Sequence, residues 1–511
     1  MSKNGLPPGW ERATLEDVTV PKRSVAKPAD FPSLPYVGME HVESETMRLL
    51  GTVPAGTLRS NALRFSPGDV LYGRLRPYLN KVLQPTFEGL CSAEFIVFPE
   101  SHALDPNYLR YFLNSWRFKR FASGLNAGDR PRVDWNQLKS HPLPIPPLLE
   151  QRRIVAAIEE QFARLDAGVA ALERTRINLK RYRASVLKAA VEGRLTERWR
   201  EEHPDVEDAK TLLQRILEER RARWEEDQLA RYDAKGQNPP KNWRSKYKEP
   251  VAPDSRDLSV LPEGWTQATV SQLNRFVRYG SSAKTSNDPS GVPFLRMGNI
   301  IEGSLDTKKL KYLPVDHSEF PELLLKVGDL LFNRTNSAEL VGKSAVYKGT
   351  PDPCSYASYL IGVRLADKCL SDYVSYFLNS SHGRAWVASI VSQQVGQANV
   401  NGTKLQALTL PLPPLAEQEE IVAEVERRLS VAEGVEAQVQ AGLKRAARLR
   451  QAILKRAFEG RLVPQDPADE PAEALLERIR AERAANAKPK RKGRSRTPRP
   501  ARTGGAQPEL F

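Results

Sequence analysis

The stretch LPIPPLLEQRRIVAAIEEQFARLDAGVAALERTRINLKRYRASVLKAAVEGRLT, from Leu143 to Thr196, occurs twice in the chain. Its second copy runs from Leu410 to Val463 and reads LPLPPLAEQEEIVAEVERRLSVAEGVEAQVQAGLKRAARLRQAILKRAFEGRLV. The copies align without a gap at a shift of 267 residues, with 21 identities in 54 positions that cluster at the two ends. The middle keeps only a pattern, in which apolar residues recur at alternating steps of three and four.

This apolar stripe predicts a long helix that packs on another helix. Its members are Val155, Ile158, Phe162, Leu165, Val169, Leu172, Leu179, Val186 and Ala190 in the first copy, and Val422, Val425, Leu429, Ala432, Val439, Leu443, Ala446, Ile453 and Ala457 in the second. Charged residues interrupt it at Arg176, Arg183, Glu436 and Arg450. Neither helix can bury such a stripe alone, so we expect the two copies to pair inside one chain. A long surface helix on a globular domain is the alternative, but it would not need the same register twice.

Helix signals mark both ends of each copy. A proline pair precedes each helix, and Glu150 and Glu417 place a carboxylate at the positive N-terminal end. Gly193 and Gly460 supply the C-terminal stop. We expect about 43 residues in each helix, which is roughly 64 Å at ~1.5 Å per residue.

The repeat extends over the whole chain. LPPGW at Leu6 returns as LPEGW at Leu261, and YLRYFLNS at Tyr108 returns as YVSYFLNS at Tyr373. Short β-type runs with one amphipathic helix near these tyrosines predict a mixed α/β (α+β) fold in each half. The predicted segments are a first loop-rich domain at 1–146, a central long helix at 147–193, a charged helical extension and linker at 194–256, a second loop-rich domain at 257–413, a distal long helix at 414–460, and a helical extension with a disordered basic tail at 461–511.

The composition favours an anionic partner. The net charge is +15, of which eight charges lie between Lys488 and Arg502, leaving 15 − 8 = +7 on the rest. That tail is either a loose phosphate-binding arm or a solvated end. Three cysteines without a nearby histidine cluster argue against a disulfide framework or a zinc site. No stretch reads as a signal or a membrane span, so we expect a cytoplasmic protein.

Candidate binding residues lie in the loops that follow two probable strands. PGDVLYGRLRP at Pro67 aligns with VGDLLFNRTNS at Val327. Arginine, asparagine, tyrosine and lysine side chains in such loops can bind guanine, adenine or phosphate. The candidates are Arg74, Arg76, Tyr78, Asn80 and Lys81 in the first half, and Asn333, Arg334, Asn336 and Lys343 in the second. The alternative is that the shared residues only shape a turn. Lys343 also belongs to Gly342-Lys343-Ser344, an incomplete phosphate loop in which Ser337 replaces the first glycine.

A second candidate segment is rich in amides. Residues 392–399 read SQQVGQAN, a composition suited to adenine, whereas the counterpart GLNAGDRPRVDW has a different character. Altered specificity and a variable loop both explain the difference. No cofactor loop, catalytic triad or metal-ligand cluster emerges from the rest of the chain, so we expect no active site and no metal site.

Together, the tryptophan-containing starts, PGDVLYGRLRP, and above all LPIPPLLEQRRIV with LKAAVEGRLT and LKRAFEGRLVPQ resemble the specificity subunit of type I restriction-modification systems. The resemblance covers essentially the whole chain. It implies two target-recognition domains separated by two long antiparallel helices, arranged as a pseudo-twofold tandem repeat. The long insert between about Glu197 and Asp257 and the basic tail depart from the family pattern.

The resemblance also implies function. Such a protein reads an asymmetric, two-part site in double-stranded DNA and recruits two methyltransferase subunits and further motor-nuclease (restriction) subunits. S-adenosylmethionine, ATP and Mg²⁺ are expected on those partners, with no cofactor in this chain. The helices act as a ruler and as the docking surface, with candidate partner contacts at Glu150, Gln151, Ile154, Glu417, Gln418 and Ile421. Rival functions are a coiled-coil scaffold or RNA-binding protein without DNA sequence specificity, and an autonomous methyltransferase or nuclease.

Overall fold

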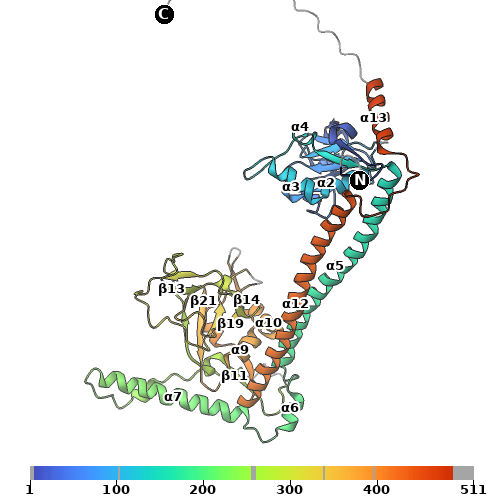
Figure 1. Ribbon diagram of the computed structural model, residues 1–511. Helices are drawn as coiled ribbons and strands as arrows, with labels where there is room; N and C mark the ends of the chain where they lie inside the picture. Colours follow the sequence, from blue (N-terminus) through green and yellow to red (C-terminus); the bar gives the residue numbers. More distant parts are fainter. Residues whose placement is uncertain (1–4, 102–103, 255–259, 338–339, 395–396, 487–511) are drawn as a thin grey trace, which may run out of the picture. The chain divides into compact units, whose positions relative to one another are not determined.

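The chain forms two compact units in a computed structural model that describes residues 5–101, 104–254, 260–337, 340–394 and 397–486 (Figure 1). Unit 1 combines Met1–Ala171 with Gly442–Phe511, and unit 2 is the continuous stretch Leu172–Ala441. Unit 1 therefore joins the two ends of the sequence. Each unit contains one globular domain with part of each long helix.

The first globular domain is built from short strands and helices of unit 1. Its strands are β1 (Glu11–Thr14), β2 (Val25–Ala26), β3 (Pro35–Val37), β4 (Val53–Pro54), β5 (Ala62–Phe65), β6 (Val70–Gly73), β7 (Val82–Leu83), β8 (Gly89–Cys91), β9 (Phe95–Phe98) and β10 (Pro142–Ile145). Its helices are α1 (Leu15–Val18), α2 (Pro106–Asn114), α3 (Trp116–Gly124), α4 (Trp135–Leu138) and the 3-10 turns η1 (Pro28–Asp30), η2 (Met39–His41), η3 (Ala55–Thr57) and η4 (Pro77–Leu79). The sheets have the orders β2-β5-β8-β3-β4, β7-β6-β9 and β1-β10.

The second globular domain repeats this architecture in unit 2. Its strands are β11 (Thr266–Thr269), β12 (Asn274–Tyr279), β13 (Val292–Leu295), β14 (Ile300–Ile301), β15 (Ser304–Leu305), β16 (Lys311–Leu313), β17 (Leu330–Asn333), β18 (Thr335–Asn336), β19 (Ser344–Val346), β20 (Ser355–Tyr356), β21 (Leu360–Leu365), β22 (Ser392–Gln394), β23 (Gln397–Asn399) and β24 (Thr409–Leu412). Its helices are α8 (Val270–Leu273), α9 (Ser371–Asn379), α10 (Ser381–Ile390), α11 (Gly402–Gln406) and η6 (Met297–Asn299). The main sheets have the orders β12-β21-β17-β19, β16-β13-β20 and β18-β23-β22.

In each domain, the first strand pairs with the last. β1 pairs antiparallel with β10 and opposes Glu11 to Ile145, while β11 pairs with β24 and opposes Thr266 to Leu412. The duplicated prolines at the end of β10 and β24 lead directly into the long helices. Each domain therefore closes on itself where a long helix begins.

The two long helices are α5 (Leu148–Val191) and α12 (Leu415–Phe458), of 44 residues each. In unit 1, Asp166 of α5 pairs with Arg450 of α12. In unit 2, Arg183 pairs with Glu436 at 2.7 Å. Unit 1 also pairs Arg153 near the start of α5 with Asp469 beyond the end of α12, and in unit 2 Thr196 beyond the end of α5 binds Glu417 near the start of α12. Within each unit the partner's number falls as the first residue's number rises, so the helices pack antiparallel, and the predicted pairing of the two copies is confirmed.

The charged interruptions of the stripe contribute to this pairing. Besides its ion pair, the Arg450 guanidinium lies 4.2 Å from the ring centre of Phe162. The side chains of Arg183 and Arg450 are only 18 % and 14 % exposed. In the sequence these arginines interrupt the apolar stripe, whereas in the structure their side chains form contacts between the two helices.

Each domain has two consecutive helices where the sequence predicted a single helix. The expectation of a single amphipathic helix near Tyr108 or Tyr373 is corrected, because α2 ends before Ser115 and α9 before Ser380. Each serine hydroxyl accepts a hydrogen bond from a backbone N–H of the next helix, which begins there. The repeated Asn-Ser pair thus marks a helix boundary.

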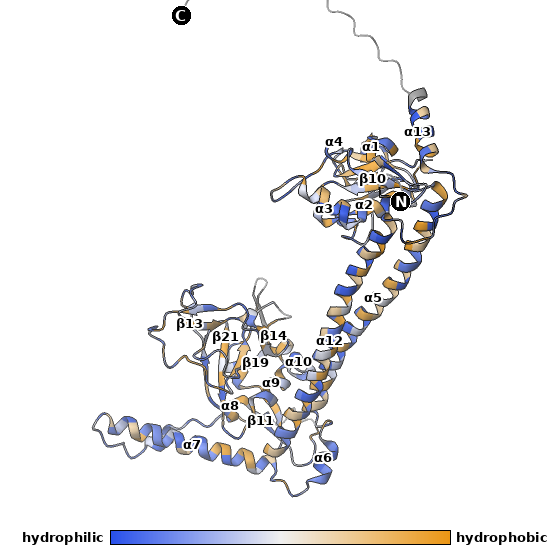
Figure 2. Ribbon diagram, in the orientation of Figure 1, coloured by the Kyte–Doolittle hydropathy of each residue, from blue (hydrophilic) through white to orange (hydrophobic). Residues whose placement is uncertain are grey.

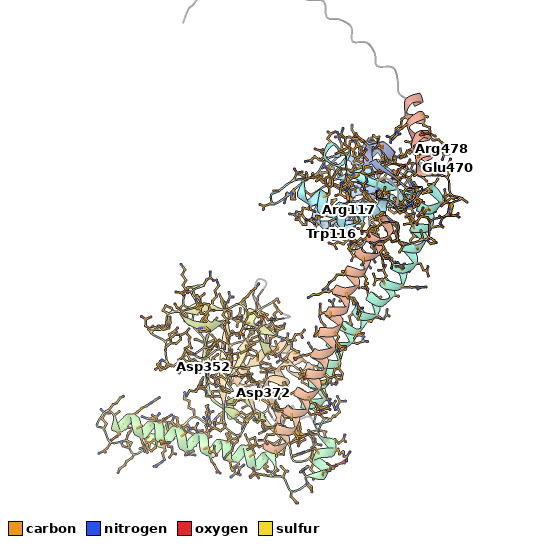
Figure 3. The ribbon with its side chains drawn as sticks, viewed as in Figure 1. Trp116, Arg117, Asp352, Asp372, Glu470 and Arg478 are labelled. Carbon is orange, nitrogen blue, oxygen red and sulfur yellow. The ribbon has the colours of Figure 1, made fainter. Side chains whose placement is uncertain are left out.

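Further helices follow each long helix. α6 (Glu197–Glu202), α7 (Ala209–Asp233) and η5 (Trp243–Lys246) follow α5, and α13 (Ala472–Asn486) follows α12. Before α13, Glu470 pairs with Arg478 at 2.6 Å (Figure 3). Buried residues of α7 and α13 join the cores of units 2 and 1, respectively. The basic tail lies outside the described residues.

The cores are apolar and hold the cysteines. Buried apolar residues form the cores of the domains and continue onto α5 and α12, along which orange and blue segments alternate in Figure 2. All three cysteines are free and buried, and burial raises the pKa of Cys91 and of Cys354 to about 12. Within the described residues, no helix has the length and apolar character needed to cross a membrane.

Candidate nucleic-acid interface

In the first globular domain, the loop after β6 is a tight turn. Arg76 and Asn80 adopt left-handed backbone conformations, with φ of 52° and 48°, on either side of η4. Asn80 is 1 % exposed, and its side-chain amide donates to the carbonyl oxygen of Asn114 at 2.8 Å. The Lys81 ammonium donates to the carbonyl oxygen of Met39 at 2.6 Å. For Asn80, these contacts favour the turn-shaping alternative.

Arg74, Arg76 and Tyr78 keep surface available to a ligand. Tyr78 is 44 % exposed, and both arginines are partly exposed. Within the described part of the chain, neither arginine forms an ion pair, and the Nε atom of each is buried without a hydrogen-bond partner. Free guanidinium groups can bind phosphate or guanine. DNA contact by these three residues therefore stays a prediction with suitable geometry.

This loop pairs with a segment that lies more than 50 residues further along the chain. The Arg76 N–H donates to the carbonyl oxygen of Pro131 at 2.8 Å, and the Val133 N–H donates to that of Arg74 at 3.0 Å. The partner segment is GLNAGDRPRVDW, the counterpart of the amide-rich stretch. The structure thus joins the two candidate segments that the sequence presented separately.

The second globular domain repeats the arrangement around β17. Asn333 is 1 % exposed, and its amide donates to the carbonyl oxygen of Leu340 at 3.0 Å, which again favours a turn-shaping role. The Val400 N–H donates to the carbonyl oxygen of Arg334 at 2.9 Å, as Val133 does to Arg74. β18 pairs with β23, opposing Thr335 to Asn399. The side chains of Asn336 and of residues 392–397 lie outside the described part.

Arg334 is held in place by its neighbours. Its guanidinium lies 4.8 Å from the ring centre of Tyr279, and its Nη1 donates to the carbonyl oxygen of Ser358 at 3.4 Å. Tyr279 is 43 % exposed. A cation over an exposed aromatic ring presents both a charge and a stacking face. Such a pair suits a phosphate or a base edge.

A cavity of about 650 Å³ lies beside this loop in the second domain. Lys343 and Asn333 line it together with Arg296, Met297 and Tyr359. Met297 is 37 % and Tyr359 52 % exposed, and Arg296 is also exposed. The cavity therefore combines two cations with exposed apolar and aromatic groups, which suits nucleic acid better than a small neutral ligand.

Arg296, Met297 and Tyr359 were not among the residues predicted from the sequence. A signal for Arg296 was present, because PYVGMEHV at Pro35 aligns with PFLRMGNI at Pro293 and the arginine replaces Gly38. Both positions precede a 3-10 turn. The residue before the turn therefore carries a charge in the second domain and none in the first.

The six candidate partner-binding residues lie at the starts of the long helices and are buried. Glu150, Gln151, Ile154, Glu417, Gln418 and Ile421 are each at most 1 % exposed. Their contacts within the chain explain the repeated motif without a partner subunit. Contact between these residues and another subunit stays a prediction.

The two glutamines make the same bonds in both units. The Gln151 side-chain oxygen accepts from the Asp105 N–H at 2.9 Å, and that of Gln418 accepts from the Leu370 N–H at 3.0 Å. Each side-chain amide also donates to a proline carbonyl oxygen before the helix, at 3.0 Å in both units. The hydroxyls of Tyr108 and Tyr373 donate to the last strand at 2.8 Å. The glutamines therefore fasten each globular domain to its long helix.

The two glutamates have different surroundings. Glu417 pairs with Arg200 at 2.8 Å and accepts from the Thr196 hydroxyl and the Trp265 indole, each at 2.7 Å. Glu150 accepts from the Gln465 amide at 3.2 Å. Burial raises the pKa of Glu150 above its ordinary value. Both glutamates bind the segment that follows the other long helix in sequence.

The titratable side chains form no metal centre in the part of the chain that the structure describes. No group of three or more His, Cys, Asp or Glu side chains gathers there with ligand geometry.

Known proteins resemble the chain over most of its length. The family model described as "Type I restriction modification DNA specificity domain" matches residues 7–179 and 262–440. The type I restriction enzyme EcoKI specificity subunit of Escherichia coli strain K12 is 28 % identical, covering 95 % of this chain and 98 % of its own. The StySPI specificity subunit of Salmonella potsdam is 26 % identical, with the same coverage.

A solved structure shares the fold. It comes from a study titled "Structural basis underlying complex assembly and conformational transition of the type I R-M system". Its TM-score is 0.58 at 22 % identity, covering 89 % of this chain and 99 % of the other. The predicted mixed fold, with two domains and long helices, is thereby confirmed.

Proposed function

Because the chain belongs to the type I restriction modification DNA specificity domain family, we propose that each globular domain reads one half of a two-part DNA sequence. As a member of this family, the chain is a DNA-recognition subunit and not the catalyst. The first domain reads through the loop after β6, and the second through the loop after β17 with its neighbouring cavity. The scaffold and RNA-binding alternatives are not favoured, since the matched family is one of DNA specificity.

The observation that carries this proposal is the bond shared by both interfaces. Val133 to Arg74 and Val400 to Arg334 are the same backbone contact, so both domains hold the same two segments together. The side chains presented there differ, with Arg76 and Tyr78 in the first domain against the cavity residue Arg296 in the second. The same backbone contacts with different side chains support an asymmetric target, whose two halves differ in sequence.

The long helices set the gap between the half-sites in this proposal. The pairing of α5 with α12 within each unit supports this spacer role. Deleting one heptad from each helix changes the gap and leaves the recognised bases unchanged. A variant with altered bases and an unaltered gap would contradict the spacer role.

The partners of this function are two methyltransferase subunits and the restriction subunits. Duplication of the domains and of the long helices supports two equivalent docking positions, one for each methyltransferase subunit. S-adenosylmethionine belongs to the methyltransferase subunits in this proposal, and ATP with Mg²⁺ to the restriction subunits. This chain contributes the DNA sequence preference to the assembly.

Methylation mapping tests the proposal. The chain is co-expressed with a methyltransferase subunit of the same system, and methylated adenines are mapped in host DNA. One two-part motif that appears only with both proteins is the expected result. Methylation by this chain alone would contradict a non-catalytic role, and a stable complex without any motif would favour a scaffold.

A further inference from the structure

The insert after α5 folds back on itself. Trp224 of α7 stacks on Trp243 of η5 with 5.9 Å between ring centres and meets Tyr247 edge-on at 5.3 Å. The guanidinium of Arg221 lies over Tyr247 and that of Arg244 over Trp243. The segment expected to be a linker is therefore packed along α7. We call α7 with residues 234–254 the arm.

The arm is fastened to the second globular domain. The Ala209 N–H donates to the carbonyl oxygen of Gly264 at 2.8 Å, and the Thr269 hydroxyl donates to that of Val251 at 2.5 Å. The Arg220 guanidinium donates to the carbonyl oxygen of Asn274. Contacts at both ends of the arm hold it as a fixed part of unit 2.

A cavity of about 490 Å³ lies between the arm and the second domain. Five cations line it, namely Arg220, Arg223, Lys246, Lys248 and Arg275, against the two acids Glu219 and Asp227. Glu219 is already paired with Lys368, and Arg275 with Asp367. Even after these pairs, the lining keeps an excess of positive charge. Figure 2 shows α7 as mostly hydrophilic.

Several groups in the cavity have no partner. Across the described residues, Arg223, Lys246 and Lys248 form no ion pair. The Tyr247 hydroxyl is buried and has no hydrogen-bond partner. Burial, with the charges of Arg223 and Arg364, lowers the pKa of Arg275. Exposed cations that line one cavity beside an unsatisfied hydroxyl favour an anionic ligand with several oxygen atoms.

We propose that this cavity binds phosphate groups of duplex DNA that flanks the recognised sequence on the side of the second half-site. The inference rests on the proposed DNA-recognition function, which brings a polyanion to this unit. Three free cations on a fixed arm can follow successive phosphates, and none of them needs to read a base. The arm thus adds affinity without adding sequence preference.

The test compares two DNA duplexes. The complex of the full chain with its methyltransferase subunits binds either a duplex that ends at the recognised motif or one that extends about 20 base pairs beyond the second half-site. Affinity is measured at several salt concentrations for the unmodified chain and for the double variant Arg223→Gln with Lys246→Gln. Arg231→Gln with Lys235→Gln is the matched control, because these exposed cations of the arm do not line the cavity.

The double variant is expected to bind the long duplex about three- to tenfold more weakly, with a salt slope lower by about 2, since each phosphate contact contributes about 0.9. The short duplex and the control keep their affinity. Equal affinity for the long duplex, or the same loss on both duplexes, would overturn the inference. Failure of the folded variant to assemble with the methyltransferase would also overturn it, and would point to an acidic protein partner. Loss of motif discrimination by the unmodified chain would instead overturn the proposed function.

Discussion

The start of α5 and the start of α12 carry the same motif, yet the two buried glutamates are stabilised differently. Glu417 has a guanidinium partner and two further donors, whereas Glu150 has an amide donor and a raised pKa. The neighbouring glutamines, by contrast, make the same pair of bonds in both units. The two helix starts therefore share the hydrogen bonds of the glutamine but differ in the groups that surround the glutamate carboxylate.

The largest effect that this comparison predicts follows from removing the charge partner of Glu417. Arg200→Ala leaves a buried carboxylate without its cation. We expect a loss of about 3 kcal/mol, toward the lower end for a broken buried ion pair, because two hydrogen-bond donors remain. Denaturant unfolding of unit 2 measures the loss. The control is Arg198→Ala, whose side chain is 89 % exposed, and equal effects of the two changes would contradict the importance of the buried pair.

The glutamines are expected to respond equally. Gln418→Ala and Gln151→Ala each leave a backbone N–H and a proline carbonyl oxygen without their partner. The expected loss is about 2 kcal/mol in the unit that carries the change, typical of orphaned buried polar groups. Hydrogen exchange at the Asp105 and Leu370 amides reports the same loss locally. A marked difference between the losses of stability in the two variants would contradict the equivalence of the two glutamine contacts.

The ion pair between α5 and α12 in unit 2 is expected to contribute less to stability. Arg183→Ala removes two ion pairs, one with Glu436 of α12 and one with Glu302 of the second domain, and in both the carboxylate is partly exposed. We expect up to about 1 kcal/mol, as for other partly exposed pairs, and a decrease of the effect in high salt. Thermal unfolding at low and high salt measures this. A loss that does not depend on salt would assign the effect to packing instead.

The smallest effect concerns the pH dependence at Glu150. Because its folded pKa lies above the ordinary value of 4.5, the folded state binds the proton more tightly than the unfolded state. Its contribution to stability is therefore present at low pH and is lost as pH rises from about 4.5 through the folded pKa. Glu150→Gln is expected to remove this decline, as shown by unfolding midpoints of unit 1 across pH. An unchanged pH profile would contradict the raised pKa.

The sequence predicted the parts of this fold that periodicity and repetition encode. The apolar stripe led to α5 and α12 and to their pairing, and the repeated motifs led to two related domains. The stripe did not reveal that Arg183 and Arg450 make contacts between the helices, because a charged residue on a stripe looks like a defect until its partner is known. The packing of Trp243 on Trp224 was also hidden, since proline and charge around it are typical of linkers.

The candidate interface was predictable only in part. Strand-end loops with arginine pointed to Arg74, Arg76 and Arg334, but the sequence gives no measure of burial, so Asn80 and Asn333 looked equally available. Their amides bond to backbone groups 34 and 7 residues away, contacts that arise only from tertiary packing. The cavity residues Arg296 and Tyr359 come from separate strands and turns, which no local pattern joins.

The most direct test of the central claim is a domain exchange followed by methylation mapping. The first globular domain of this chain is replaced by that of a relative with a known target, and the hybrid is co-expressed with its methyltransferase subunit. We predict a motif in which one half changes to that of the relative, while the other half and the gap stay as they were. A hybrid that assembles and methylates with both halves changed, or with neither, would contradict the assignment of one half-site to each domain.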